Sequence, residues 1–388
     1  MARMPAFVSV LLSLVLAAVS APFADTPAAH APASRAKVAA PALRVTKVVT
    51  GLDNPWDVKV LPSGSLLITE RDRARLSTYS GGHRTTVAFP SSKVWVSGET
   101  GLMSLAIDPD FATNHRFYTC SGWRKPGGRH DVRVQAWQLS PDEATASHRQ
   151  VLIQGFPTSS GRHGGCRLLI TDNGSLLIGT GDAAEGKNPQ NLDSLGGKTL
   201  RIDRMTGKPW PTNKWADASG RRKYVQTYGH RNVQGLAQRA DGTLWSIEHG
   251  PDRDDEINLL KNGGNYGWNP VPGYNESVPM TDQSLPGKQI DARWSSGYPT
   301  LATSGGTFLP SSGWGKFNGT LAVAALKASR LMFVKFDSSG HFRWARSPRK
   351  LRQLGRLRSV TLAPDGSLLV TTDNDNNSDW VLRVRPRG

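Results

Sequence analysis

The chain has 388 residues, enough for one large domain or two ordinary ones. Its 48 basic and 31 acidic residues give a formal net charge of +17, which favours anionic partners such as cell-wall polymers, nucleic acid or a polyanionic cofactor. The basic runs carry no nucleic-acid-binding motif and no interleaved aromatic residues, so the sequence predicts no nucleic-acid partner.

The N-terminal segment has the three parts of a secretory signal peptide. Arg3 gives a positive start, an apolar core follows from Phe7 to Val19, and small residues end the segment at Ala21. It is too short to span a membrane, and no later stretch is apolar for long enough to do so. Residues 22–42 are rich in Ala and Pro and predict a linker. We therefore expect a secreted or periplasmic protein whose folded domain covers residues 43–388.

The chain has two cysteines, Cys120 and Cys166. An even count in an exported chain favours a disulfide. The alternative is a free Cys166 beside His163 in a soft metal site. Two ligands without a CxxC-type motif are a weak signal for such a site.

One phrase recurs along the rest of the chain: an apolar strand, a turn with Ser-Gly, Asn-Gly or Asp-Gly, and a second apolar strand. Clear copies begin at Trp56, Cys166, Gln234 and Arg358, and looser copies begin at Leu102 and Gly305. Helical periodicity is nearly absent. Six such copies predict an all-β fold, a six-bladed β-propeller. The alternative, a pair of β-sandwiches, does not explain the repeated phrase.

Unusual polar residues stand at corresponding points of several copies. His163 lies in "SGRHGGCRLL", beside two glycines and just before an apolar run. Histidine titrates near neutral pH and can serve as base, acid or ligand, although it could also be an ordinary loop residue before a tight turn. Asp182 ends "GTGD", where it is either a functional acid or a turn aspartate.

The later copies carry a group of basic residues, namely Arg231, Lys327, Arg356 and Arg358. Arg356 and Arg358 are two positions apart at the start of a predicted strand, so they face the same way. Two neighbouring guanidinium groups repel each other unless an anion lies between them. One pair could be surface decoration, but the four together predict a ligand with several carboxylates.

From about Val48 to the C-terminus, the chain resembles the soluble PQQ-dependent sugar dehydrogenases. The most specific segments are "YGHRNVQGLA" (228–237), "EHGPDRDDEINLLKNGGNYGWNPVPGY" (248–274), and "GRHGGCRL" followed by "GTGD". The resemblance implies a six-bladed propeller with PQQ and Ca²⁺ as cofactors. It also implies oxidation of the anomeric hydroxyl of an aldose to a lactone, with an external electron acceptor that it does not identify.

The resemblance assigns roles to single residues. His163 matches the catalytic base and Asp182 the acid that orients it. Arg231 and Asn232 match residues over the quinone carbonyls, where negative charge develops on reduction. Lys327, Arg356 and Arg358 match residues that hold the PQQ carboxylates. Asp373 matches an acid near the cofactor.

The same resemblance predicts two metal sites and a substrate shell. The backbone carbonyls of Gly250 and Pro251 match ligands of a Ca²⁺ that polarises PQQ. A second, structural Ca²⁺ would fall near Pro272, Tyr274 and Glu276. On the sugar side we expect Glu99, Arg162 and Gln190. Glu99 replaces a glutamine of glucose dehydrogenase and Arg162 replaces an acidic residue, so the identity of the sugar stays open.

Two other functions fit a propeller. One is a non-catalytic protein that binds a protein or glycan ligand, since a fold alone does not prove catalysis. Such a protein need not keep the full set of His163, Arg231, Asn232 and the basic residues. The other is a metal-dependent lactonase, which would need a cage of carboxylate and Asn side chains on the axis in place of the basic group.

Overall fold

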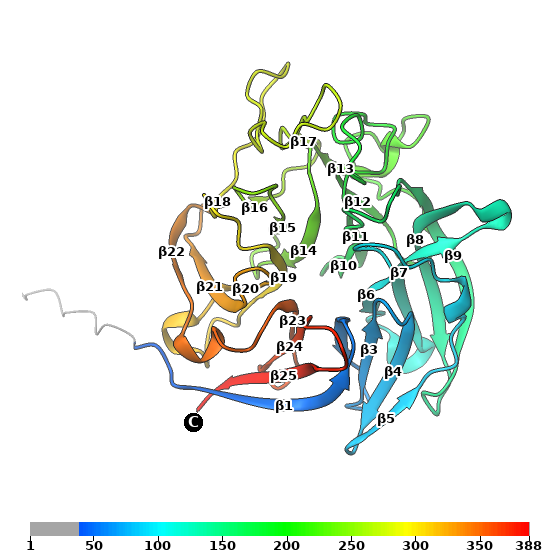
Figure 1. The fold of residues 1–388 in the computed structure, drawn as a ribbon, viewed down its shortest axis with the longest axis vertical. Coiled ribbons are helices and arrows are strands. Elements are labelled where there is room, and N and C mark those ends of the chain that lie inside the picture. Colours follow the sequence, from blue (N-terminus) through cyan, green and yellow to red (C-terminus); the bar gives the residue numbers. More distant parts are fainter. Residues whose placement is uncertain (1–38, 388) are drawn as a thin grey trace, which may run out of the picture. The chain divides into compact units, whose positions relative to one another are not determined.

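We analysed a computed structural model that describes residues 39–387. The expected signal peptide and residues 22–38 of the expected linker lie outside the described residues. The described chain forms six antiparallel sheets, or blades, arranged in a ring (Figure 1). The predicted six-bladed β-propeller is therefore confirmed. None of the helices in residues 39–387 is long and apolar enough to cross a membrane.

The first three blades follow the chain. Blade 1 holds β2 (Pro55–Val60), β3 (Leu66–Glu70), β4 (Arg75–Ser80) and β5 (His83–Thr86). Blade 2 holds β6 (Leu102–Ile107), β7 (Arg116–Arg124), β8 (His130–Leu139) and β9 (Ala146–Phe156). Blade 3 holds β10 (Arg167–Ile170), β11 (Ser175–Gly179), β12 (Lys198–Asp203) and β13 (Val225–Tyr228), with β17 (Gly264–Asn265) added in parallel to β13.

The other three blades complete the ring. Blade 4 holds β14 (Val233–Gln238), β15 (Leu244–Glu248), β16 (Glu256–Leu259) and β18 (Trp294–Ser295). Blade 5 holds β19 (Thr303–Phe308), β20 (Leu321–Ala325), β21 (Arg330–Phe336) and β22 (Phe342–Arg346). Blade 6 holds β23 (Leu357–Leu362), β24 (Leu368–Thr372), β25 (Asp379–Pro386) and β1 (Leu43–Leu52).

Helices in the described residues are short. The α-helix α1 covers Phe111–Asn114, and 3₁₀ turns cover Ser91–Lys93, Pro126–Gly128, Arg222–Tyr224, Gly315–Phe317 and Arg349–Leu351. The repeated phrase forms hairpins, because the turn glycine takes a left-handed conformation. Gly174 has φ +83° between β10 and β11, and Gly366 has φ +74° between β23 and β24.

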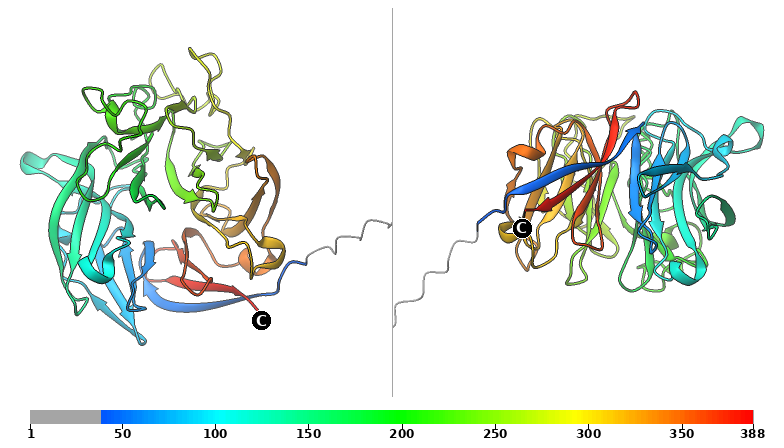
Figure 2. Two further views of the ribbon diagram at one scale, coloured as in Figure 1. Left: turned by 180° about the vertical axis from the view of Figure 1, so that it is seen from behind. Right: turned by 90° about the horizontal axis from the view of Figure 1, so that it is seen from below.

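The two ends of the described chain close the ring. Strand β1 pairs antiparallel with β25, from Leu43 opposite Pro386 to Leu52 opposite Asp379. The blue β1 runs beside the red β25 in every view of the ring (Figure 2). The last blade is thus built from both ends of the propeller, which ties blade 6 to blade 1.

Within each blade, the first strand lies nearest the axis of the ring. These first strands are β2, β6, β10, β14, β19 and β23, and each contacts its neighbours around the axis. The core is the apolar side chains packed between blades. Between blades 2 and 3, for example, Tyr118, Leu176, Ile178 and Leu200 are fully buried. The rigid first strands therefore fix the residues at their ends.

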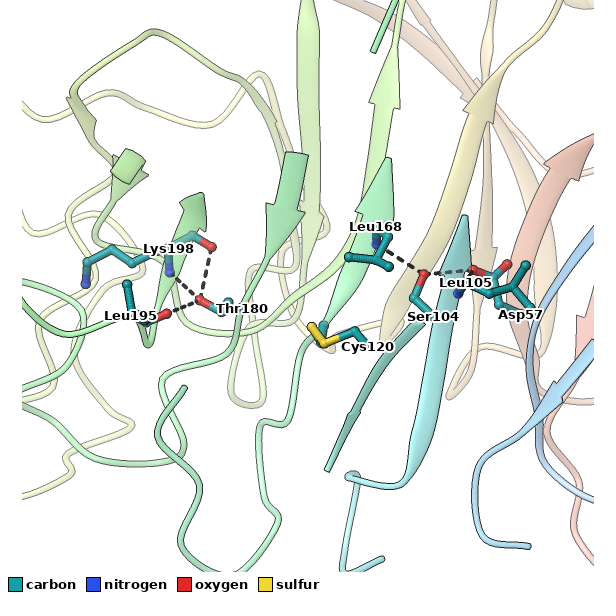
Figure 3. Close-up of a disulfide and its surroundings, with 9 residues drawn as sticks. Asp57, Ser104, Leu105, Cys120, Leu168, Thr180, Leu195 and Lys198 are labelled. Carbon is teal, nitrogen blue, oxygen red and sulfur yellow. Dashed lines mark hydrogen bonds between the residues drawn. A yellow bond between two sulfur atoms is a disulfide. The ribbon is translucent and has the colours of Figure 1, made fainter. Parts of the chain in front are cut away.

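A disulfide joins blades 2 and 3, as predicted. Cys120 lies in β7 and Cys166 directly precedes β10, with their Cα atoms 6.0 Å apart (Figure 3). Both cysteines are therefore used, and the alternative of a free Cys166 in a soft metal site is wrong.

Candidate active site

The predicted site residues gather at one end of the axis, which we call the site end. The first and second strands of each blade pair antiparallel, so the start of the first strand and the end of the second lie at the same end. Glu99, His163, Arg231, Asn232, Arg356 and Arg358 precede or begin a first strand, whereas Asp182, Gly250, Pro251, Lys327 and Asp373 follow a second strand.

His163 is held in a tight loop that requires its two glycines. Its own backbone is left-handed, with φ +51°, a conformation that non-glycine residues adopt mostly where the surroundings enforce it. A Cβ on Gly164 would collide with Thr100 Oγ1, and one on Gly165 would collide with the Gly181 nitrogen. Only glycines let this loop pack against its neighbours.

The imidazole of His163 is oriented by Asp182. His163 is 3% exposed, and its Nδ1 lies 2.7 Å from Asp182 Oδ1. Asp182 is fully buried and also accepts hydrogen bonds from the Ala184 nitrogen and Trp268 Nε1, both at 2.8 Å. A carboxylate with so many donors is an acceptor, so Nδ1 of His163 carries the hydrogen and Nε2 has the lone pair.

Tyr274 completes this cluster. Its hydroxyl donates to Asp182 Oδ2 at 2.8 Å and lies 3.0 Å from His163 Nδ1. Burial and the neighbouring Asp182 raise the pKa of the Tyr274 hydroxyl well above its ordinary value, so the hydroxyl stays protonated. No described residue bonds to His163 Nε2. The arrangement is that of a base whose reactive nitrogen is free.

An acidic residue bridges two arginines beside this cluster. Glu276 Oε2 accepts from Arg162 at 2.6 Å, and Oε1 pairs with Arg231. Burial raises the pKa of Glu276, but its hydrogen bonds with the two arginines outweigh this and lower it. Arg231 also donates to the His249 carbonyl at 3.2 Å, and its Nε is buried without a partner among the described residues.

Glu99 is a further acidic residue at the site end. Its Oε2 accepts from Asn232 Nδ2 at 2.9 Å and from Gln234 Nε2 at 3.5 Å. Burial opposes ionisation of Glu99, but its polar neighbours, including the bond from Asn232 and the charge of Arg358, lower its pKa. Glu99 is therefore a carboxylate at neutral pH.

The two predicted arginines of blade 6 differ in their environments. Arg358 is buried, pairs with Asp373 through Nε at 3.0 Å and through Nη2, and donates from Nη1 to Gln234 Oε1 at 3.2 Å. Burial raises the pKa of Asp373, but Arg358 and Arg71 outweigh it and bring the pKa to about 2. Asp373 thus neutralises Arg358 directly.

Arg356 and Lys327 are exposed and form no ion pair with a carboxylate of residues 39–387. Arg356 Nε donates to the Asp373 carbonyl at 3.1 Å, and Lys327 Nζ lies 3.3 Å from Thr300 Oγ1. Their positive charges are therefore available to an anionic ligand at the site end.

The backbone at Gly250 and Pro251 presents two oxygens without partners. Neither carbonyl accepts a hydrogen bond from the described residues. Next to them, His249 Nε2 is buried and also lacks a partner there, and burial lowers the pKa of this imidazole to about 3. Two free carbonyls and a neutral imidazole form a possible set of metal ligands. No group of three or more His, Cys, Asp or Glu residues that could hold a metal occurs in the described part of the chain.

Gln190, predicted on the sugar side, has hydrogen-bond partners that indicate a structural role. Gln190 exchanges hydrogen bonds with the side chain of Asn265 and donates to the Trp268 carbonyl at 2.9 Å. It therefore supports the segment that carries Trp268. Pro272 is exposed, and the side chains of Tyr274 and Glu276 have the partners given above.

The sequence analysis missed four residues that the structure places here: Arg71, Gln234, His249 and Trp268. Arg71 follows β3 and raises the positive potential around Asp373 and Glu99. It occupies the position after a second strand, as Asp182 does in blade 3 and Asp373 in blade 6, so the repeat could have revealed it. Trp268 gave no comparable signal, because it lies in the long, largely irregular segment between β16 and β18 of blade 4.

Comparisons with known proteins agree with this geometry. The family model for glucose/sorbosone dehydrogenase matches residues 52–383. The aldose sugar dehydrogenase YliI of Escherichia coli K12 is 30% identical over 365 residues, covering 91% of this chain and 96% of that protein.

Two solved structures are similar over most of the chain. A Thermus thermophilus oxidoreductase described as a glucose dehydrogenase has a TM-score of 0.76 at 32% identity, covering 88% of this chain and all of that one. The PQQ-bound aldose sugar dehydrogenase of Streptomyces coelicolor has a TM-score of 0.73 at 27% identity, covering 90% of this chain and all of that one. The chain therefore belongs to the glucose/sorbosone dehydrogenase family.

Proposed function

We propose that this protein is a PQQ- and Ca²⁺-dependent dehydrogenase that oxidises the anomeric hydroxyl of an aldose to a lactone. The observation that carries the proposal is the cluster of His163, Asp182, Tyr274 and Trp268, which leaves the Nε2 lone pair of a buried imidazole free. A protein that only binds a ligand has no need of such an arrangement. The family and the PQQ-bound relative support the same conclusion.

The residues at the site end fit PQQ, which carries several carboxylates. Arg356 and Lys327 offer exposed cations without acidic partners in the described chain, and Arg231 has an unpartnered Nε there. Arg358 contributes through a guanidinium that Asp373 fixes in place. When bound, PQQ would supply the acceptor for the hydride of the sugar. We assign Arg231 and Asn232 to the quinone oxygens and the other three cations to the carboxylates.

The residues also fit one Ca²⁺. Calcium prefers oxygen ligands, and the Gly250 and Pro251 carbonyls are free of bonds from the described residues. When bound, this ion would polarise the cofactor. We do not extend the proposal to the second calcium near Pro272, Tyr274 and Glu276. Both carboxylate oxygens of Glu276 already accept from arginines.

In this proposal, His163 Nε2 takes the proton of the anomeric hydroxyl. The imidazolium that forms is stabilised by Asp182, whose charge is held by Trp268, Tyr274 and the Ala184 nitrogen. Glu99 faces the same space as a carboxylate and, with Arg162, lies where it could contact the sugar hydroxyls. The signal-peptide pattern supports secretion of the protein.

The test is reconstitution of the purified protein with PQQ and Ca²⁺, followed by dye reduction over a panel of sugars. We expect reduction with at least one aldose, dependence on both cofactors, and a lactone as product. Tight PQQ binding without turnover of any sugar would favour the alternative of a non-catalytic binding protein. Failure to bind PQQ would reject the proposal altogether.

A further inference from the structure

A cavity of about 660 Å³ lies on the axis at the end opposite His163, which we call the far end. Its wall includes Val60, Ile107, Ile170, Gln238, Thr307 and Leu362, one from each blade. Each of these residues lies at or near the end of its first strand, whereas the site residues lie at the starts. The cavity is therefore distinct from the active site, and its size is that of a small-molecule site.

The inner end of the cavity is closed by a buried polar group. Asp57 is fully buried, and its Oδ2 accepts from Ser104 Oγ at 2.8 Å and from the Leu105 nitrogen at 3.2 Å (Figure 3). The same carboxylate pairs with Lys59 at 2.8 Å and with Arg167 at 2.9 Å. Asp57 thus has its full complement of donors.

Arg167 and Lys59 each have an N–H group without a hydrogen-bond acceptor among the described residues. Arg167 is 5% exposed, binds Asp57 through Nη1 and donates from Nε to the Gln234 carbonyl at 2.9 Å. Its Nη2 is buried and has no hydrogen-bond partner among the described residues. Lys59 Nζ binds Asp57 and Thr361, so one of its three hydrogens has no acceptor within residues 39–387. Both residues line the cavity.

The charge at this inner end is positive. Two cations face one carboxylate, and although burial and the nearby Arg358 lower the pKa of Arg167, it remains about 10, so the guanidinium is charged at neutral pH. Asp172, the one carboxylate among the described residues that line the cavity, is exposed and forms no ion pair there. Leaving a buried guanidinium N–H without an acceptor is unfavourable, and a carboxylate or phosphate oxygen is its strongest acceptor.

The side walls are apolar. Leu168, Leu236 and Val360 line the cavity between its polar inner end and the far face. We propose that this axial cavity binds a small molecule with an anionic head, carboxylate or phosphate, and an apolar body. The head lies on Lys59 Nζ beside the Arg167 guanidinium, and the body lies against the apolar walls. The proposal does not depend on the dehydrogenase function.

The test is isothermal titration of the full chain with benzoate, phenyl phosphate and benzyl alcohol. We expect 1:1 binding of at least one anion with a Kd of about 1 mM or tighter, and binding of the uncharged alcohol at least about tenfold weaker. The two anions distinguish a carboxylate head from a phosphate head. No binding of either anion would overturn the proposal and leave water as the partner of Arg167.

Variants locate the binding site. Lys59→Met should weaken anion binding about tenfold or more while Asp57 keeps Arg167 as its partner, and Thr307→Trp should block the cavity without removing a charge. Lys93→Met, the matched control at an exposed lysine of the 3₁₀ turn Ser91–Lys93, should leave binding unchanged. If Lys93→Met weakens binding as much as Lys59→Met, the anion responds only to net charge and the proposal is wrong. Thermal melting of each variant separates loss of binding from loss of fold.

Discussion

The two ends of the propeller have the same strands but different connections. At the far end, four of the six connections between first and second strands are short turns with a left-handed glycine, as at Gly174, whereas His115 takes that conformation in the longer connection of blade 2. At the site end the connections are longer, and non-glycine residues adopt that conformation at His163, Ala183, Ala184 and Asp375–Asn377. The far-end turns serve the fold, whereas the site-end loops store local strain to place side chains.

The largest expected effect tests whether chemistry is confined to the site end. His163→Ala removes the proposed base, so turnover should fall about 10²-fold to 10⁴-fold while PQQ still binds. The matched control is His341→Ala, because His341 is an exposed histidine in a far-end turn. Steady-state rates of both reconstituted variants measure the effect. Near-normal turnover of the His163 variant would remove this residue from the mechanism.

The second prediction concerns the crosslink that anchors the His163 loop. Cys120 and Cys166 are separated by 46 positions, and by the chain-entropy relation their bond contributes about 4 kcal/mol of stability. The double variant Cys120→Ala/Cys166→Ala should lower the free energy of unfolding by that order in urea titrations. Because Cys166 lies three residues after His163, we also expect lower turnover at temperatures where the variant is folded. An unchanged unfolding midpoint would contradict the prediction.

The third prediction separates cofactor-binding charge from surface charge. Arg356→Ala should raise the PQQ concentration needed for half-maximal activity about 10-fold to 100-fold, because a hydrogen bond to a charged group contributes about 1.5–3 kcal/mol. Arg343→Ala is the control, since Arg343 is an exposed arginine of β22 in the neighbouring blade 5. Its PQQ titration should overlay that of the parent protein. Equal shifts for both variants would mean that only net charge matters.

The fourth prediction uses the pKa of Asp373, which is lowered to about 2 from an ordinary value of 3.8. An acid with a lowered folded-state pKa stabilises the fold above its unfolded pKa, and this stabilisation disappears as the pH falls from about 4 to 2. Its contribution is on the order of 2 kcal/mol. Asp373→Asn should therefore lose stability at pH 6 and lose less at pH 2, as measured by urea unfolding. The exposed Asp172→Asn should show no such pH-dependent difference.

The repeated hairpins made the fold predictable, because each copy carries its own turn glycine and apolar strands. The positions of Asp182 and Asp373 were predictable for the same reason, because each residue follows the second strand of a repeated hairpin. Trp268 and Tyr274 were not found as partners of Asp182, since they come from the largely irregular chain between β16 and β18, which has no period. The bridge from Glu276 to Arg162 and Arg231 depends on three-dimensional placement over 114 and 45 positions, which local pattern cannot give.

The smallest expected effect divides the site end itself into a cofactor side and a sugar side. Glu99 is a carboxylate beside His163 and Asn232, and it makes no ion pair with Arg356 or Lys327. Glu99→Gln keeps the shape and the bond to Asn232 but removes the charge. Relative kcat/KM values across a sugar panel should then change by about tenfold or less, while the PQQ requirement stays the same. Arg356→Ala should do the reverse when sugars are compared at saturating PQQ. If Glu99→Gln changes the PQQ requirement more than Arg356→Ala does, Glu99 belongs to the cofactor side and this division of the pocket fails.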